Sequence, residues 1–313
     1  MSKTALFIAF NVGVLAILAI DLGVFNKKAH AASVKEAAIW STVWITLSLG
    51  FAGLILHLYG RQPALEFVTG YVIEYSLSVD NIFVIVLIFS YFRIPEKYQH
   101  RVLFWGIMGA LVMRGAMIAG GAILINRFHW VIYVFGAFLI FTGIRMATHD
   151  ESDIEPEANP ILRLVRRVLP ITHDYRGQEF FVKEPPTRGA PPTLMATPLF
   201  VVLVLVETTD LIFAVDSIPA IFAVTRDPFL VYTSNVCAIL GLRSLYFLLA
   251  GVINKFHLLK LGIAAVLTFV GVKMLLSGYY EIPIHLSLMV IVGVLASSVI
   301  ASIVFPKKVP EKP

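Results

Sequence analysis

Two apolar stretches of this chain each carry a pair of carboxylates six residues apart, and this feature constrains the fold most. The first pair is Glu74 and Asp80, and the second is Asp210 and Asp216. In both copies a valine precedes the second acid, and a short polar residue and an isoleucine follow it. An ionised carboxylate at the centre of a bilayer helix costs about 2.5–3.5 kcal/mol on insertion scales. Two matched pairs therefore indicate a polar pathway through the membrane.

The composition indicates that these stretches do lie in a membrane. Hydrophobic residues make up 58% of the 313 residues, charged residues make up 14%, and the mean hydropathy is +0.84, which excludes an ordinary soluble domain. A helix needs about 20 mainly apolar residues to cross a hydrocarbon core of about 30 Å. The sequence predicts an all-α polytopic membrane protein with about nine transmembrane helices, at 4–25, 38–59, 67–92, 101–123, 128–147, 195–223, 229–252, 257–278 and 284–305.

The first of these segments has some features of a cleavable signal peptide, because an Ala-His-Ala sequence at 29–31 follows the apolar run. The run is long, however, and Asp21 interrupts it. Lys27 and Lys28 also come before any cleavage point. We therefore expect a retained first helix.

The lysines and arginines of the short loops predict the orientation. The side that holds the N-terminus carries few of them: Lys3, Arg61, Arg127 and Arg226. The opposite side carries many: Lys27, Lys28, Lys35, Arg93, Lys97, Arg101, Lys255, Lys260, Lys307, Lys308 and Lys312. We therefore expect the N-terminus outside and the C-terminus in the cytoplasm. Nothing in the basic residues indicates nucleic acid binding, and one cysteine, Cys237, permits neither an intramolecular disulfide nor a cysteine-based metal site.

An internal repeat relates predicted helices 3–5 to predicted helices 6–8. Besides the acidic pairs, both copies share an arginine in mid-segment and a terminal block with matching Asn, Phe, His, Gly and Met residues. Because three helices are an odd number, the second copy crosses the membrane in the opposite sense. Such inverted repeats are typical of secondary transporters, whose substrate sites lie near the midplane where the copies meet. The matched landmarks are Arg114 with Arg243, Asn126 with Asn254, Gly143 with Gly271, and Met146 with Met274.

The spacing of the acids limits how they can act together. On an unbroken helix, residues six apart point about 120° away from each other, so one continuous helix cannot aim both at one ion. Either the helices are unwound in mid-membrane, helped by nearby Ser and Thr residues and by Pro219, or each carboxylate meets partners from the other copy. Glu207, three residues before Asp210, is close enough in angle to join the same cluster.

The residue types in these motifs are hard oxygen donors, which suit Mg²⁺, Ca²⁺ or Mn²⁺ better than soft metals. Protons that load when the metal leaves would give metal/proton exchange. For Arg114 and Arg243 two interpretations stay open, a tether that pairs with an acid and a counter-ion that gates the site. The predicted metal ligands are Glu74, Asp80, Asn81, Glu207, Asp210, Asp216 and Ser217.

The predicted organisation has five parts. These are two N-terminal helices at 1–66, the first repeat at 67–147, a cytoplasmic loop at 148–194, the second repeat at 195–278, and a final helix with a basic tail at 279–313. In the loop, residues 149–157 are densely acidic and favour a solvated linker over an ion sensor. Residues 161–169 place three arginines on one helical face, which predicts a short helix on the anionic inner leaflet. The Pro-rich remainder predicts a linker.

The acidic motifs also resemble a known family. Residues 205–220 with 224–229, and residues 74–81, are similar to the signature of the TerC family of integral membrane proteins, and the opening of the chain is similar to the family's Alx branch. The resemblance implies a bacterial inner-membrane protein associated with manganese efflux, with tellurite resistance or with redox modulation. It carries the family's acidic positions onto Glu74, Asp80, Asn81, Asp210, Asp216 and Ser217. Manganese as the particular cation is implied by this resemblance alone.

The leading hypothesis is a secondary transporter, not an enzyme, that exports Mn²⁺ as its substrate and needs no cofactor. The alternative is a non-transport membrane component of a redox-modulating or tellurite and metal stress-resistance system. A single cysteine and the lack of a haem or flavin motif argue against electron transfer. An intramembrane aspartyl protease is disfavoured, because neither Asp80 nor Asp216 follows a Gly-x-Gly sequence.

Overall fold

The structure is a computed structural model that consists almost wholly of helices. It describes residues 3–20, 33–128, 130–148, 163, 167, 169–172, 174–185, 191–250, 258–280 and 282–305. The helices are α1 (Lys3–Ile20), α2 (Val34–Tyr59), α3 (Arg61–Tyr91), α4 (Glu96–Arg127), α5 (Val131–Thr148), α7 (Pro198–Phe222), α8 (Pro228–Leu240), α9 (Leu242–Leu249), α10 (Leu259–Leu276) and α11 (Ile284–Val304). Two strands, β1 (Phe181–Glu184) and β2 (Thr193–Ala196), complete the described elements.

The helices confirm the prediction of a polytopic all-α membrane protein. Within the described ranges, seven helices are long and apolar enough to cross a membrane, and the pair α8 and α9 makes an eighth if it counts as one span. The predicted first span corresponds to α1, whose apolar helix Lys3–Ala19 is shorter than the seven spans. The chain is therefore a multi-pass integral membrane protein.

The span predicted at 229–252 is not one straight helix. The N-terminus of α8 is capped: Asp227 accepts a hydrogen bond from the Phe229 N–H, and Pro228 occupies the first turn. At Gly241 the backbone N–H donates to the Ile239 carbonyl, two residues earlier, so the regular helical bonding is interrupted. α9 then continues at an angle of 41° to α8.

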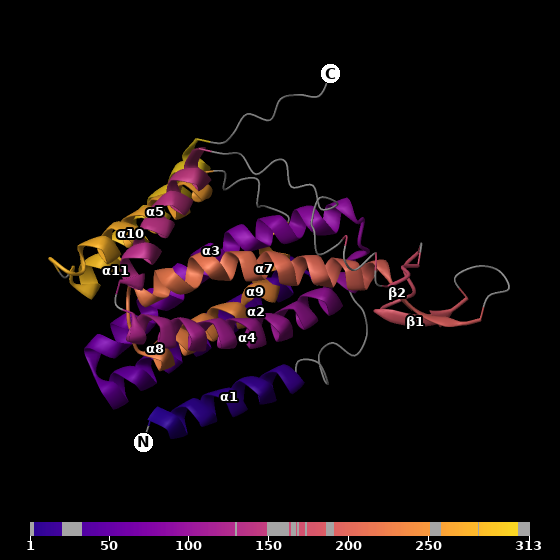
Figure 1. Cartoon of the computed structure of the whole chain (residues 1–313), viewed down its shortest axis with the longest axis horizontal. Coiled ribbons are helices and arrows are strands. Elements are labelled where there is room, and N and C mark those ends of the chain that lie inside the picture. Colours follow the sequence, from indigo (N-terminus) through magenta and orange to yellow (C-terminus); the bar gives the residue numbers. More distant parts are fainter. Residues whose placement is uncertain are drawn as a thin grey trace.

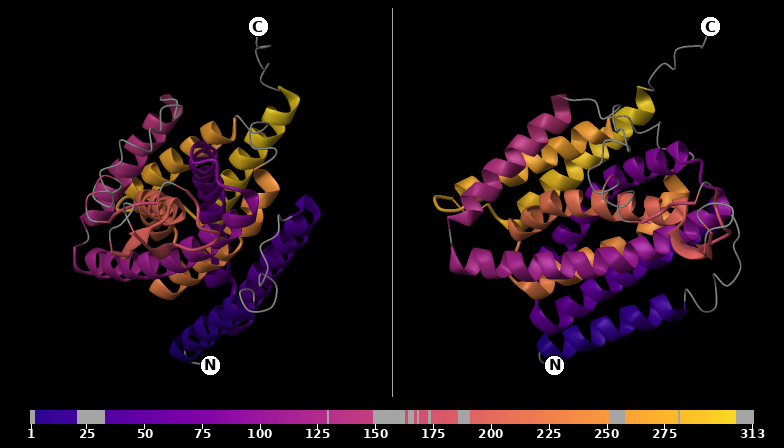
Figure 2. Two further views of the ribbon diagram at one scale, coloured as in Figure 1. Left: turned by 90° about the vertical axis from the view of Figure 1, so that its right-hand side faces the viewer. Right: turned by 45° about the vertical axis from the view of Figure 1, so that its right-hand side comes forward.

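The helices form a main bundle and an inclined group beside it. In Figure 1, α3 and α7 lie near the middle of the main bundle, α1 follows its lower edge, and α5, α10 and α11 form the inclined group at the upper left. The two further views in Figure 2 show α1 on the periphery again. α3 and α7 contact each other, and each also packs on the middle span of the other predicted copy, α3 on α8 and α7 on α4.

The third helices of the two predicted copies, α5 and α10, pack against each other through glycines. A Cβ added at Gly136 would lie 2.9 Å from the Gly271 carbonyl oxygen, and one added at Gly271 would lie 2.6 Å from the Gly136 carbonyl oxygen. Gly143 meets the Ala264 carbonyl in the same way, at 2.7 Å. Small residues let membrane helices approach this closely. The two contacts exchange matching positions of the copies, Gly136 with Ala264 and Gly143 with Gly271, and the inverted repeat itself stays a prediction.

Polar contacts join the ends of the helices at the side where the chain begins. Lys3 donates to Asp227 at 2.6 Å and lies over the Tyr59 ring, so the start of α1, the end of α2 and the turn before α8 are neighbours. The basic-residue count placed the N-terminus, Arg61 and Arg226 on one side, and this arrangement agrees with that grouping. Which face of the membrane this side meets stays a prediction.

At the other end of the bundle, the Pro-rich segment is not only a linker. β1 and β2 pair as an antiparallel hairpin, from Phe181 opposite Ala196 to Glu184 opposite Thr193. The segment before it packs on the helix ends: the Tyr175 hydroxyl donates to the Phe92 carbonyl at 2.7 Å. On the exposed side, Arg176 binds both carboxylate oxygens of Glu184, and this pair lowers the pKa of that carboxyl from its ordinary value. The linker prediction is wrong for these residues, because strand pairing and apolar packing order them.

Several predictions concern residues outside the described part of the chain. These are Asp21, the acidic segment 149–157, and most of the basic helix at 161–169, of which only residues 163, 167 and 169 are described.

Candidate cation site at the contact of α3, α4 and α7

Both helices that carry the acidic pairs are unbroken. α3 runs through Glu74 and Asp80, and α7 runs through Asp210 and Asp216. The hydroxyls expected to satisfy an unwound backbone instead donate to carbonyls of their own intact helices, Ser76 to Val72, Thr208 to Val204 and Thr209 to Val206. The unwinding alternative is therefore wrong.

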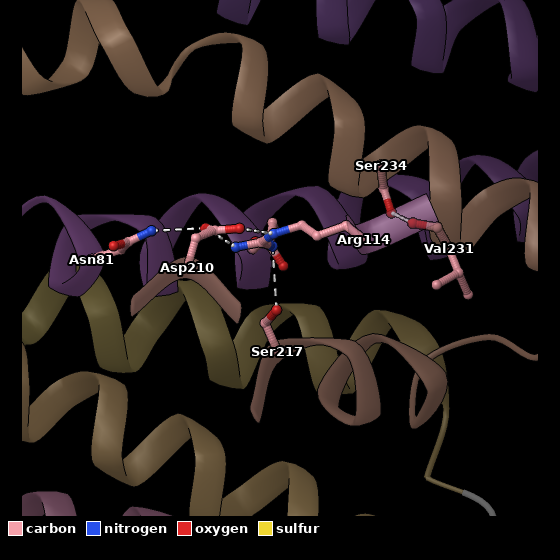
Figure 3. A network of polar contacts seen from close by, with 7 residues as sticks. Asn81, Arg114, Asp210, Ser217, Val231 and Ser234 are labelled. Carbon is pink, nitrogen blue, oxygen red and sulfur yellow. Dashed lines mark hydrogen bonds and ion pairs between the residues drawn. The ribbon is translucent and has the colours of Figure 1, made fainter. Parts of the chain in front are cut away.

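Asp210 follows the other alternative, because its partners come from the other predicted copy. Arg114 of α4 donates from Nε to Asp210 Oδ2 at 3.1 Å and from Nη2 to Asp210 Oδ1 at 2.8 Å. Asn81 of α3 also donates to Asp210 Oδ1, at 2.9 Å. Figure 3 shows Asn81 and Arg114 reaching this aspartate from opposite directions. A carboxylate of the predicted second copy is thus held by an amide and a guanidinium of the predicted first copy.

The same guanidinium binds a second carboxylate. Arg114 Nη1 forms an ion pair with Glu74 of α3 and lies 3.4 Å from the hydroxyl of Ser217 on α7, as drawn in Figure 3 for Ser217. The charged guanidinium of Arg114 therefore connects α3 to α7. We call the five side chains the Arg114 network; its members are Glu74, Asn81, Arg114, Asp210 and Ser217.

All five side chains of the Arg114 network are buried. Glu74 is 0% exposed, Arg114 3% and Asp210 5%. Two buried oxygen acceptors of the network, Glu74 Oε2 and Asn81 Oδ1, have no hydrogen-bond donor among the described residues. A buried acceptor without a donor is costly, and a bound cation would satisfy such an atom. Apart from the arginine, the side chains of the network offer only oxygen atoms as possible metal ligands.

Asp216 lies in a different environment from Asp210, although both are on α7. It is half-buried and accepts a hydrogen bond from Thr142 of α5 at 3.2 Å. Arg145, the charged group of α5 that acts on it electrostatically, is exposed. The two aspartates of α7 are six residues apart and thus have partners on different helices, Asp210 on α4 and Asp216 on α5, as the angular argument requires.

Glu207 lies against α4 near the network. Its carboxylate occupies the space beside Gly109, where a Cβ would overlap it, and its Oε2 atom is buried without a donor among the described residues. Glu207 is therefore placed close to, but not bonded within, the Arg114 network.

The remaining predicted residues are not in the network. Asp80 is buried on α3, and Arg243 is half-buried on α9, beyond the bend. Among the residues that the structure describes, no three Asp, Glu, His or Cys side chains gather as closely as a preformed metal site requires. The network therefore brings together four of the seven predicted ligands, with Arg114 in their midst.

Two residues of this region were not predicted from the sequence. Thr142, the partner of Asp216, matches an apolar residue, Val270, in the other copy, so the repeat does not draw attention to it. Gly109 makes room for Glu207, and a glycine in an apolar helix gives no sign of which side chain it will face. The packing of α5 on α7 identifies the role of Thr142, and the packing of α4 on α7 identifies that of Gly109.

Comparison with known proteins decides the family. The sequence profile of the integral membrane protein TerC family matches residues 59–309, which include every member of the Arg114 network. The chain belongs to the TerC family. The resemblance inferred from the acidic motifs is thereby confirmed.

Relatives of this TerC protein cover almost its whole length. An uncharacterized membrane protein of Myxococcus xanthus is 51% identical over 97% of this chain and 92% of its own. The Escherichia coli (strain K12) protein Alx, named as a proposed membrane-bound redox modulator, is 49% identical over 93% of this chain and 92% of its own. A membrane protein of Rickettsia bellii is 41% identical over 95% and 97%. No solved structure matches the chain.

Proposed function

We propose that this protein is a secondary transporter that exports a divalent metal cation through the Arg114 network. One observation carries the proposal: two fully buried carboxylates from the two predicted copies, Glu74 and Asp210, converge on a single positive charge between α3 and α7. Charged residues inside a membrane are rare, and they mark substrate and ion pathways. Substrate sites of inverted-repeat carriers lie where the copies meet, as this network does.

The chemistry of the site favours a hard cation. Carboxylate, amide and hydroxyl oxygens suit Mg²⁺, Ca²⁺ and Mn²⁺, and the acceptors Glu74 Oε2 and Asn81 Oδ1 are available to a ligand. Membership of the TerC family supports Mn²⁺ as the substrate. Metal/proton exchange is one way to restore the site, because carboxylates that lose a metal can take up protons.

The proposed setting is the bacterial inner membrane, with the N-terminus outside and the C-terminus in the cytoplasm. The distribution of basic residues supports this orientation. The bacterial relatives, which match almost the whole length of this chain, support the location. Export then means that the Arg114 network loads from the side of the β1–β2 hairpin.

Uptake of radiolabelled Mn²⁺ into proteoliposomes tests the proposal. The parent should carry Mn²⁺ down its gradient, Asn81→Ala should raise the half-saturating Mn²⁺ concentration, and Asp210→Asn should abolish flux. Glu184→Gln, which alters an exposed pair on the hairpin, is the matched control and should transport like the parent. Parent protein that moves no divalent cation in either orientation would contradict transport.

The second candidate function is a non-transport component of a redox-modulating or stress-resistance system, including tellurite resistance. The name of the Escherichia coli relative favours it. The one cysteine of the chain, Cys237, is buried on α8, which leaves a thiol-based redox role without an accessible group. Resistance in cells combined with no metal flux in liposomes would favour this candidate.

A further inference from the structure

The guanidinium of Arg114 lies between two carboxylates that are also proposed ligands of the cation. It contacts Glu74 on α3 and Asp210 on α7 at the same time, so it bridges the two helices that a metal would bridge. It comes from a third helix, α4, and its side chain is fully buried with its partners. The arginine and the cation therefore compete for the same two carboxylates.

Burial makes this competition necessary. Two carboxylates inside a membrane protein are stable only with a counter-charge, because removing one partner of a buried pair leaves an uncompensated charge. A divalent cation supplies that charge while it is bound, but only if the guanidinium gives up at least one of its carboxylates. Once the cation leaves, a counter-charge is needed again.

We infer that Arg114 is a tethered substitute for the transported cation, which occupies Glu74 and Asp210 whenever the carrier is empty and yields to the cation when it loads. This inference rests on the proposed transport function and adds its coupling. An empty carrier neutralised by its own arginine can return across the membrane without carrying a proton or a second metal ion. Net export then needs no obligatory counter-ion.

A purely structural tether makes a different prediction. If Arg114 only holds α3, α4 and α7 together, its loss weakens the fold and lowers every transport mode equally. If it substitutes for the cation, its loss blocks only the return of the empty carrier. The loaded carrier still crosses in both directions, so exchange of metal for metal survives. Binding of metal becomes tighter, because the competitor is gone.

The experiment compares two transport modes in proteoliposomes that contain Arg114→Gln, Arg114→Lys or parent protein. Net efflux of radiolabelled Mn²⁺ is measured into metal-free buffer, and exchange is measured into buffer with unlabelled Mn²⁺. For Arg114→Gln we expect net efflux to fall about tenfold or more while exchange stays within about threefold of the parent. Arg114→Lys keeps a charge but not the bidentate geometry, so its net efflux should be intermediate.

Affinity gives an independent readout that does not depend on transport. Titration of Mn²⁺ into detergent-solubilised protein should show tighter binding to Arg114→Gln than to the parent. Arg176→Gln removes the exposed arginine–carboxylate pair of the hairpin and is the matched control. We expect its net efflux and its exchange to equal those of the parent.

Three results would overturn the inference. Net efflux and exchange that fall in parallel indicate a structural tether. Net efflux by Arg114→Gln that equals the parent's shows that the arginine does not limit the return step. Net efflux by the parent that rises when the receiving buffer is acidified shows that protons carry the return step. Parent protein that fails in both modes contradicts the transport function, and this outcome is distinct from the other three.

Discussion

Two of the contacts between the predicted copies differ in the kind of groups that form them. At the contact of α5 and α10, backbone touches backbone through Gly136 and Gly271, and no charged group takes part in those close approaches. At the contact of α3, α4 and α7, the Arg114 network joins the copies through buried charges. The close approaches of the first contact involve no charged group, whereas the second is held by a guanidinium that a metal cation displaces in the proposed mechanism. We expect the first to stay fixed while the second rearranges.

The largest expected effect separates Asp210 from Asp216. Asp210→Asn removes one of the two carboxylates that compensate the buried Arg114, and breaking a buried pair of this kind costs about 3–5 kcal/mol. Asp216→Asn alters a half-buried group with one hydrogen bond, which is worth about 1 kcal/mol. The unfolding temperatures of the two purified variants in the same detergent measure the difference. Equal shifts would contradict the distinct roles that the structure assigns to the two aspartates.

The glycine contact is tested by adding a single methyl group. Gly271→Ala places a Cβ 2.6 Å from the Gly136 carbonyl oxygen, so the two backbones must separate, at a cost of about 1–3 kcal/mol for an overpacked contact. Gly120→Ala on α4 is the matched control, because its Cβ meets nothing within 4 Å. Helix propensity alone favours alanine there by up to about 1 kcal/mol. Thermal unfolding should therefore move in opposite directions for the two variants, and a parallel shift would mean that α5 and α10 tolerate separation.

The smallest effect concerns the hairpin, where an ion pair is exposed and not buried. Since Arg176 lowers the pKa of Glu184 below its ordinary value of 4.5, the pair contributes fully above that value. Its contribution is lost as the pH falls through the lowered pKa. Glu184→Gln should thus be slightly less stable than the parent at pH 6 and equal to it in strong acid. The difference should also vanish in high salt, and a difference that persists there would contradict a screened surface pair.

The sequence alone predicts much of this fold, for physical reasons. Long apolar runs have few structures open to them other than membrane-spanning helices, so the all-α polytopic class is predictable from the sequence. The bend at Gly241 was not foreseen, because a lone glycine within an apolar run is tolerated in many straight helices. The sequence does not predict the β1–β2 hairpin, because its short strands lie among prolines, which are typical of a linker.

The candidate site was predicted in part. The six-residue spacing indicated that the acids of one helix point to different partners, and Asp210 and Asp216 do so. Which arginine approaches them depends on the packing of α4 on α7, which no local pattern contains. The internal repeat matches Arg114 with Arg243, yet Arg114 lies on an unbroken helix and Arg243 follows the bend.

The bent pair α8 and α9 also bears on how the chain enters the membrane during synthesis. α8 has 13 residues and α9 has 8, so they are about 20 Å and 12 Å long. Neither crosses a hydrocarbon core of about 30 Å by itself. The insertion machinery must therefore take both as one unit, although buried polar residues such as Ser234 and Asn235 weaken its apolar character. Helices made earlier, α3 and α4, are then already present as partners, so the order of synthesis favours the completed span.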